Sequence, residues 1–230
     1  MSRLGIITGM KVEADILSAA ARGAPEQSRP LIAAAGGNAG RAENAARGFA
    51  AAGVRGLVSF GIAGGLDPRL KSGDIILADT VLPPGDEGIA THQVWCAAFA
   101  AAFAAASVIE GTICGSDRAV STPREKAKLF AQTGAVAVDM ESHGVGRAAR
   151  EAGLSLLVVR AIADSASRTI PNAAIAGLGE DGGRKPFAVI GKLLRHPTQL
   201  VHLIGVARDS KVALRRLAYA APAILDTAEI

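Results

Sequence analysis

Aromatic side chains are scarce in this chain of 230 residues. Phenylalanine, tryptophan and tyrosine together make up 3% of the sequence, whereas half of the residues are hydrophobic and glycine is plentiful. We therefore expect a core of alanine, valine, isoleucine and leucine, connected by many tight turns. No nucleic-acid partner is expected.

Cysteine and long hydrophobic runs are also rare. Cys96 and Cys114 have neither the spacing of metal ligands nor a histidine cluster beside them. We expect two reduced thiols in a cytoplasmic protein. Residues 1–7 contain no secretion signal, and the alanine-rich residues 96–109 fall short of the roughly 20 residues that span a bilayer. These shortages argue against a disulfide scaffold and against a membrane-spanning protein.

Short apolar runs alternate with alanine-rich stretches along the chain, which is typical of strands and helices in alternation. Strands are expected at residues 4–8, 31–35, 55–60, 73–82, 108–114, 134–138 and 154–162. Helices are expected at residues 12–21, 41–52, 91–107 and 122–133. A further helix is expected to end just before Gly153, and another to span 187–217 with a break near Pro197. Residues 164–183 are expected to form a loop with one short helix. The alternation predicts a single α/β domain over residues 1–230, with a central mixed β-sheet flanked by helices.

Positive charge is concentrated in a C-terminal tail, residues 184–220. The stretch from Arg184 to Arg216 contains many basic residues and only one acidic residue, Asp209. Because they are interleaved with apolar residues, the tail is expected to form amphipathic helices with one apolar and one basic face. Two interpretations stay open: a helix packed on the core with a solvated basic face, or a peripheral contact with an anionic membrane.

Glycine-rich segments follow three of the predicted strands, at Gly9, at residues 36–40 and at residues 61–65. Glycine lets the backbone approach a ligand closely and present N–H groups to its oxygen atoms. None of the three segments has the full spacing of a dinucleotide fingerprint or of a Walker loop. A nicotinamide-dependent dehydrogenase is therefore disfavoured.

Acidic residues also follow predicted strands. Glu13 comes after the first strand, Glu141 after a later one, and Asp164 after the last. A parallel arrangement would bring them to one edge of the sheet, where open α/β sheets bind their ligands. Their use in a site is favoured over the alternative that Asp139 merely caps a helix. Arg160, inside an apolar run, is expected to meet a carboxylate such as Glu141, since burying it unpaired would be costly.

Three blocks of sequence carry a family resemblance: SFGIAGGLDPRLKSGDIILA at residues 59–78, AVDMES at 137–142 and VVRAIADS at 158–165. Together they resemble the purine and uridine phosphorylase and methylthioadenosine nucleosidase family, in its order and spacing. The tail resembles the hopanoid-associated phosphorylase branch of that family. The resemblance implies a phosphorylase/hydrolase-like fold, a homodimer or higher homo-oligomer, and no metal or organic cofactor.

The resemblance also implies cleavage of the N-ribosidic bond of a purine nucleoside. Asp164 matches the acid that protonates N7 of the leaving base, and its apolar strand would raise its pKa. Glu141 matches the carboxylate that binds the 2′- and 3′-hydroxyls of ribose, and Glu13 matches the glutamate that activates water in nucleosidases. The other residues expected to contact substrate are Met140 on the sugar face, Val120, Ala119, Ala63, Gly64 and Asp139.

The acceptor of the ribosyl group stays open between water and inorganic phosphate. Ser59 stands where uridine phosphorylases carry a phosphate-binding arginine, and the candidates left for phosphate are Gly9, Arg41 and Arg118. The branch resemblance implies adenosylhopane, a lipid-linked adenosine, as the substrate. The alternatives are a soluble methylthioadenosine/S-adenosylhomocysteine-type nucleosidase, a purine nucleoside phosphorylase, and a nucleoside-binding protein without turnover.

Overall fold

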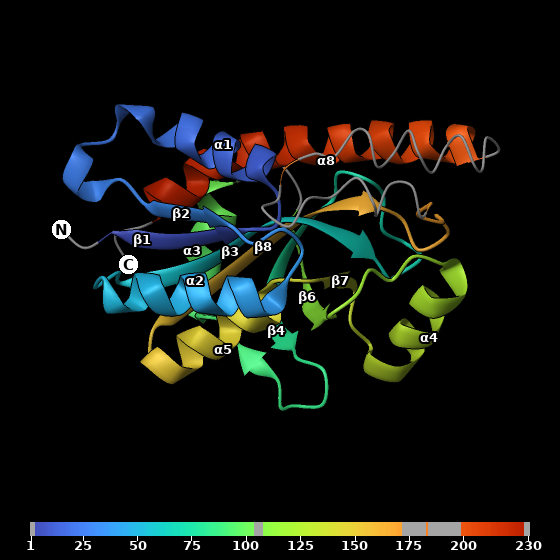
Figure 1. The fold of residues 1–230 in the computed structure, drawn as a ribbon, viewed down its shortest axis with the longest axis horizontal. Coiled ribbons are helices and arrows are strands. Elements are labelled where there is room, and N and C mark those ends of the chain that lie inside the picture. Colours follow the sequence, from blue (N-terminus) through green and yellow to red (C-terminus); the bar gives the residue numbers. More distant parts are fainter. Residues whose placement is uncertain (1–2, 104–107, 172–182, 184–198, 228–230) are drawn as a thin grey trace.

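A mixed β-sheet lies between two layers of helices in the computed structural model, which describes residues 3–103, 108–171, 183 and 199–227 (Figure 1). The strands are β1 (Leu4–Thr8), β2 (Leu31–Ala34), β3 (Gly56–Gly65), β4 (Ile75–Leu82), β5 (Ile89–Ala90), β6 (Val108–Gly115), β7 (Ala137–Asp139) and β8 (Ser155–Asp164). The helices are α1 (Lys11–Ala20), α2 (Ala39–Ala51), α3 (Gln93–Ala102), α4 (Pro123–Thr133), α5 (Ser142–Ala152) and α8 (Gln199–Asp226). The predicted single α/β domain with a mixed sheet is confirmed.

The strand order brings the ends of distant strands together. It runs β2-β1-β3-β7-β6-β4-β5, and β8 pairs with both β3 and β4. Strands β1, β2, β3 and β8 run parallel, whereas β7 is antiparallel to β3 and β8 is antiparallel to β4. The pairings therefore connect β3, β7, β6, β4 and β8 in a closed circuit, with β1 attached beside β3.

The glycine-rich turn predicted at residues 61–65 is wrong, because β3 continues through this segment to Gly65. Residues 56–64 of β3 pair with β8, and Gly64 and Gly65 pair with Val138 and Ala137 of β7. The strand predicted at residues 134–138 likewise begins later, since Gly134 has a φ of 67° and ends α4. The two-residue strand β5 lies between the strand predicted at residues 73–82 and the helix predicted at 91–107, where no element was predicted.

Two hydrophobic clusters fill the spaces on either side of the sheet. On one side α1, α3 and α8 cover the sheet, and Trp95, Phe99 and Leu217 are buried there. On the other side α2 and α5 pack together, with Ala46 and Ala149 between them. The core is aliphatic as expected, except that α3 contributes several of the few aromatic rings.

The C-terminal tail supplies a core helix. Helix α8 buries Ala213, Leu217 and Ile224, and these apolar contacts carry it past Pro222, beyond the end predicted from the sequence. One face of this part of the tail packs on the core, as the first of the two interpretations requires, and residues 184–198 lie outside the described residues. No helix in the described part of the chain is both long and apolar enough to cross a membrane.

The contact between α2 and α5 depends on a glycine. A Cβ atom at Gly144 of α5 would lie 2.2 Å from the backbone oxygen of Ala39, whereas a Cβ at Gly48 of α2 would meet nothing within 4 Å. We expect Gly144→Ala to lower the free energy of unfolding by about 1–3 kcal/mol. Gly48→Ala, the matched control in an exposed helical position, should raise it by about 1 kcal/mol. Urea unfolding of both variants measures the two changes, and equal effects would contradict this account of the helix contact.

Candidate functional site

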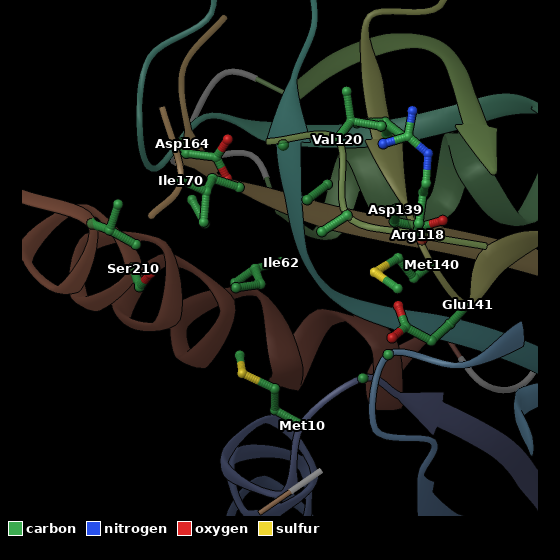
Figure 2. Close-up of a pocket in the computed structure, with 18 of the residues that line it drawn as sticks. Met10, Ile62, Arg118, Val120, Asp139, Met140, Glu141, Asp164, Ile170 and Ser210 are labelled. Atoms are coloured by element: carbon green, nitrogen blue, oxygen red, sulfur yellow. The ribbon is translucent and has the colours of Figure 1, made fainter. Parts of the chain in front are cut away.

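A cavity of about 480 Å³ opens at one end of the sheet, which is a size common among small-molecule sites (Figure 2). Its rim consists of segments that end or follow β1, β2, β3, β6, β7 and β8, together with α8. The lining residues are Gly9, Met10, Glu13, Gly37, Ile62, Ala63, Gly64, Arg118, Ala119, Val120, Val138, Asp139, Met140, Glu141, Ala163, Asp164, Ile170, Val206 and Ser210.

The structure brings all but one of the predicted site residues to this cavity. Those that line it are Glu13, Ala63, Gly64, Ala119, Val120, Asp139, Met140, Glu141, Asp164, Gly9 and Arg118. The exception is Arg41, whose guanidinium donates hydrogen bonds to the carbonyl oxygens of Ala35 at 2.7 Å and Gly36 at 3.1 Å. Arg41 is therefore not among the residues that line the cavity, and its binding of phosphate stays a prediction.

A fully buried arginine organises the acidic end of the cavity. The guanidinium of Arg160 lies 2.5 Å from Asp139 and 3.6 Å from Glu141, so it meets two carboxylates where the sequence predicted one. It also donates hydrogen bonds to the hydroxyls of Ser59 at 2.6 Å and Ser142 at 3.0 Å. Ser59 is thus part of a buried polar network that fixes Arg160.

Glu13 lies beside this network. Its carboxylate accepts hydrogen bonds from the backbone N–H groups of Met10 at 2.7 Å and Ile62 at 2.8 Å. A Cβ atom at Gly61 would be 2.9 Å from either Glu13 oxygen and 2.5 Å from Nη1 of Arg160, so glycine at this position leaves room for both groups. Burial raises the pKa of the Glu13 carboxyl, although the positive charge of Arg160 acts in the opposite direction.

Glu141 is the second carboxyl at this end. It follows β7 and packs against Gly9, where a Cβ atom would lie 2.7 Å from its Oε1. Burial raises its pKa to about 8, and the neighbouring Asp139 and Glu13 carboxylates act in the same direction. Figure 2 shows its oxygen atoms beside Met140 and far across the cavity from Asp164.

Asp164 marks the opposite end of the cavity. It is the last residue of β8, and burial raises its pKa as the sequence predicts. Its partner was not predicted from the sequence: Asp164 forms an ion pair with the fully buried Lys126 of α4. A signal for this burial was present, since Lys126 precedes Leu129 and Phe130 by three and four residues and so shares the apolar face of α4.

One wall of the cavity comes from outside the sheet. Val206 and Ser210 of α8 and Ile170 line it. Figure 2 shows Ser210 and Ile170 on the side of Asp164 and Ile62. An ion pair of 2.6 Å between Arg168 and Asp209 joins the segment after β8 to α8. These residues were not predicted from the sequence, because the pattern of a core-facing helix does not show which of its turns border a cavity.

The buried carboxyls make stability depend on pH. A carboxyl whose pKa is higher in the folded protein than in the unfolded chain holds its proton more tightly when folded, so the free energy of unfolding falls as pH rises between the two values. For Glu141 this window runs from 4.5 to about 8. We expect the melting temperature to fall across it, and Glu141→Gln to reduce the fall. Thermal melts at several pH values test this; Glu151→Gln, at an exposed position of α5, is the control and should leave the slope unchanged.

Several solved structures share this fold. A methylthioadenosine/S-adenosylhomocysteine nucleosidase from Neisseria meningitidis, in complex with methylthio-immucillin-A, is 18% identical with a TM-score of 0.74, covering 97% of this chain and 98% of that one. The corresponding nucleosidase from Colwellia psychrerythraea, in complex with adenine, is 18% identical with a TM-score of 0.71, covering 98% and 95%. Futalosine hydrolase of Helicobacter pylori is 16% identical with a TM-score of 0.70, covering 95% and 97%.

No curated protein gives a significant match to the chain. The model of the phosphorylase superfamily, however, matches residues 3–185, which is most of the chain and includes the three sequence blocks that carry the family resemblance. The matched range also contains the acidic end of the cavity and Asp164. The chain therefore belongs to the phosphorylase superfamily, and it is an enzyme of the nucleoside phosphorylase and nucleosidase class.

Proposed function

We propose that this protein hydrolyses the N-ribosidic bond of an adenosine with a 5′ substituent and releases adenine. The observation that carries the proposal is the arrangement of one cavity, with Asp164 at one end and Glu141, Glu13 and Arg160 at the other. A nucleoside placed between them would present its base to Asp164 and its ribose to Glu141. No metal or organic cofactor is required for this chemistry.

At the base end, Asp164 acts as the general acid. A purine anion is a poor leaving group, so protonation of N7 as the C1′–N9 bond breaks lowers the barrier. Burial raises the pKa of the Asp164 carboxyl, which is the direction that this role requires. Val120 and Ala119 would contact the base from the segment after β6.

At the ribose end, Glu141 binds the 2′- and 3′-hydroxyls while Met140 packs on the sugar. The ribose acquires positive charge as the bond breaks, and a carboxylate beside it stabilises that charge. Burial favours a protonated Glu141 in the empty cavity, with a pKa of about 8. A cationic transition state would reverse this preference, so the interaction would be strongest when the barrier is crossed.

Water is the acceptor that the surroundings favour. At this end Arg160 is paired with Asp139 and Glu141, and Arg118, which also lines the cavity, is paired with Glu125 at 2.8 Å. An anionic phosphate would therefore lie among acidic groups that already neutralise these cations. A phosphate at Gly9 would lie directly against Glu141. Glu13 would accept a proton from the attacking water.

The substituent at the 5′ position is proposed to be apolar. The wall on the side of α8 includes Met10, Ile62, Ile170 and Val206, with Ser210 as a small polar member. Such a wall suits a hydrocarbon group better than a charged one. The resemblance of the tail to the hopanoid-associated branch makes adenosylhopane our proposed substrate, and methylthioadenosine the alternative that the similar nucleosidases favour.

Release of adenine tests the function directly. We expect the protein to liberate adenine from adenosylhopane and to form a free ribose end on the lipid, with or without phosphate in the buffer. Asp164→Asn should lower kcat by about 10²–10⁴-fold without loss of folding. Chromatography of the base and mass spectrometry of the lipid measure both products.

Three other results would point elsewhere. Formation of a ribose 1-phosphate only in the presence of phosphate would show that the acceptor is phosphate. Faster cleavage of methylthioadenosine than of adenosylhopane would favour a soluble nucleosidase. Tight adenosine binding without release of adenine, unchanged in Asp164→Asn, would show a binding protein.

A lipid-linked substrate also suggests contact with an anionic membrane through the outer face of α8. Arg208, Lys211 and Arg215 are exposed there, and Ile204 and Tyr219 are 61% and 62% exposed. We expect sedimentation with vesicles of anionic lipid, and a loss of about 1 kcal/mol of binding for each charge removed. The variant R208Q/K211Q/R215Q should stay in the supernatant, whereas Lys128→Gln on α4 should sediment normally. Equal sedimentation of both variants would reject the contact.

A further inference from the structure

A lysine that no solvent reaches contacts the acid end of the cavity. Lys126 is 0% exposed, although it lies on α4, a helix with many charged residues. Its ammonium group donates hydrogen bonds to the Asp164 carboxylate, to the Ser165 carbonyl oxygen at 2.7 Å and to the Arg168 carbonyl oxygen at 3.2 Å. These three acceptors match the three N–H donors of an ammonium group.

The contacts join two segments that border the base end of the cavity. Helix α4 begins with a capping box in which Thr122 and Glu125 bind each other's backbone N–H groups. The segment after β8 returns to the start of α4, where the N–H of Ile170 donates to the carbonyl oxygen of Ser121 at 2.8 Å. Lys126 therefore reaches Asp164 from a helix whose start is fixed on both sides.

We propose that Lys126 is a positioning residue for the reaction: it holds the Asp164 carboxyl group at the base end of the cavity, and its positive charge determines the pH at which Asp164 loses the proton that it gives to the purine. The inference rests on the proposed role of Asp164 as the general acid. When the C1′–N9 bond breaks, its electron pair moves into the base and the proton of Asp164 moves to N7. Asp164 becomes a carboxylate at that moment, and the ammonium group of Lys126 stabilises the new charge.

Two other charged side chains lie near Asp164, but they have little net effect on it. Arg168, from the segment after β8, and Asp209, from α8, also face Asp164. These two form an ion pair with each other at 2.6 Å, so their effects on Asp164 largely cancel. Burial raises the pKa of Asp164 and Lys126 lowers it, which makes the carboxyl a stronger acid than burial alone would allow.

The pH profile of kcat/KM separates this role from a purely structural one. In the wild type, the alkaline limb reports the loss of the Asp164 proton in the free enzyme. We expect Lys126→Met and Lys126→Gln to move this limb to higher pH by about 1–3 units, because an opposite charge at contact distance has been removed. We also expect kcat at pH 7 to fall about tenfold or more, because the new carboxylate is no longer stabilised.

Two further variants serve as controls. Lys128→Met removes an exposed charge from the same helix and should leave both the limb and kcat unchanged. Lys126→Arg keeps the positive charge and should keep the limb at its wild-type position even where the larger side chain lowers kcat.

A lowered kcat in Lys126→Met or Lys126→Gln with an unmoved alkaline limb would overturn the proposal. If neither neutral variant folds, a displaced limb in Lys126→Arg would overturn it equally. Failure of the wild-type protein to release adenine would instead contradict the proposed function, so the two ideas fail through different measurements.

Discussion

The site depends on one buried guanidinium. Arg160 lies in the middle of β8, where no water can solvate it, and its charge is tolerated because Asp139 and Glu141 lie within 2.5 and 3.6 Å. Both of these carboxylates are also buried, and burying their negative charge without Arg160 would cost free energy. The interaction is therefore mutual, and it ties β8 to the end of β7 at the position where the ribose of a nucleoside would bind.

The sequence predicted the acidic residues of the cavity because their positions follow from strand ends. Glu13, Glu141 and Asp164 each lie at or just after the end of an apolar run. Glu13 and Asp164 follow the parallel strands β1 and β8, whose ends meet at one edge. Glu141 follows β7, which is antiparallel to β3, so the predicted parallel arrangement is wrong for this strand and Glu141 reaches the cavity through the pairing of β7 with β3. The helix capped by Thr122 and Gly134 was predictable for a similar reason, since its signals are local. Features that a residue and its neighbours in the sequence determine, such as strand ends and helix caps, could therefore be predicted without the structure.

Other features depend on contacts between distant segments. The extension of β3 to Gly65 results from pairing with β8 and β7, and no local pattern distinguishes it from a glycine-rich turn. The pairing of Lys126 with Asp164 also depends on a distant segment, because it is the end of β8 that brings Asp164 to the lysine. Arg41 fits a phosphate site by its position in the sequence, but its side chain is occupied by nearby carbonyl oxygens.

The cavity is lined by two groups of residues that come from different parts of the chain, and helix α8 supplies one of them. The groups proposed for bond cleavage come from the sheet and the segments next to it, whereas Val206 and Ser210 come from a helix that the family match at residues 3–185 does not include. Substitutions on that helix can change the shape offered to a ligand while the acids stay in place. Such an arrangement lets selectivity evolve, or be redesigned, without rebuilding the catalytic apparatus.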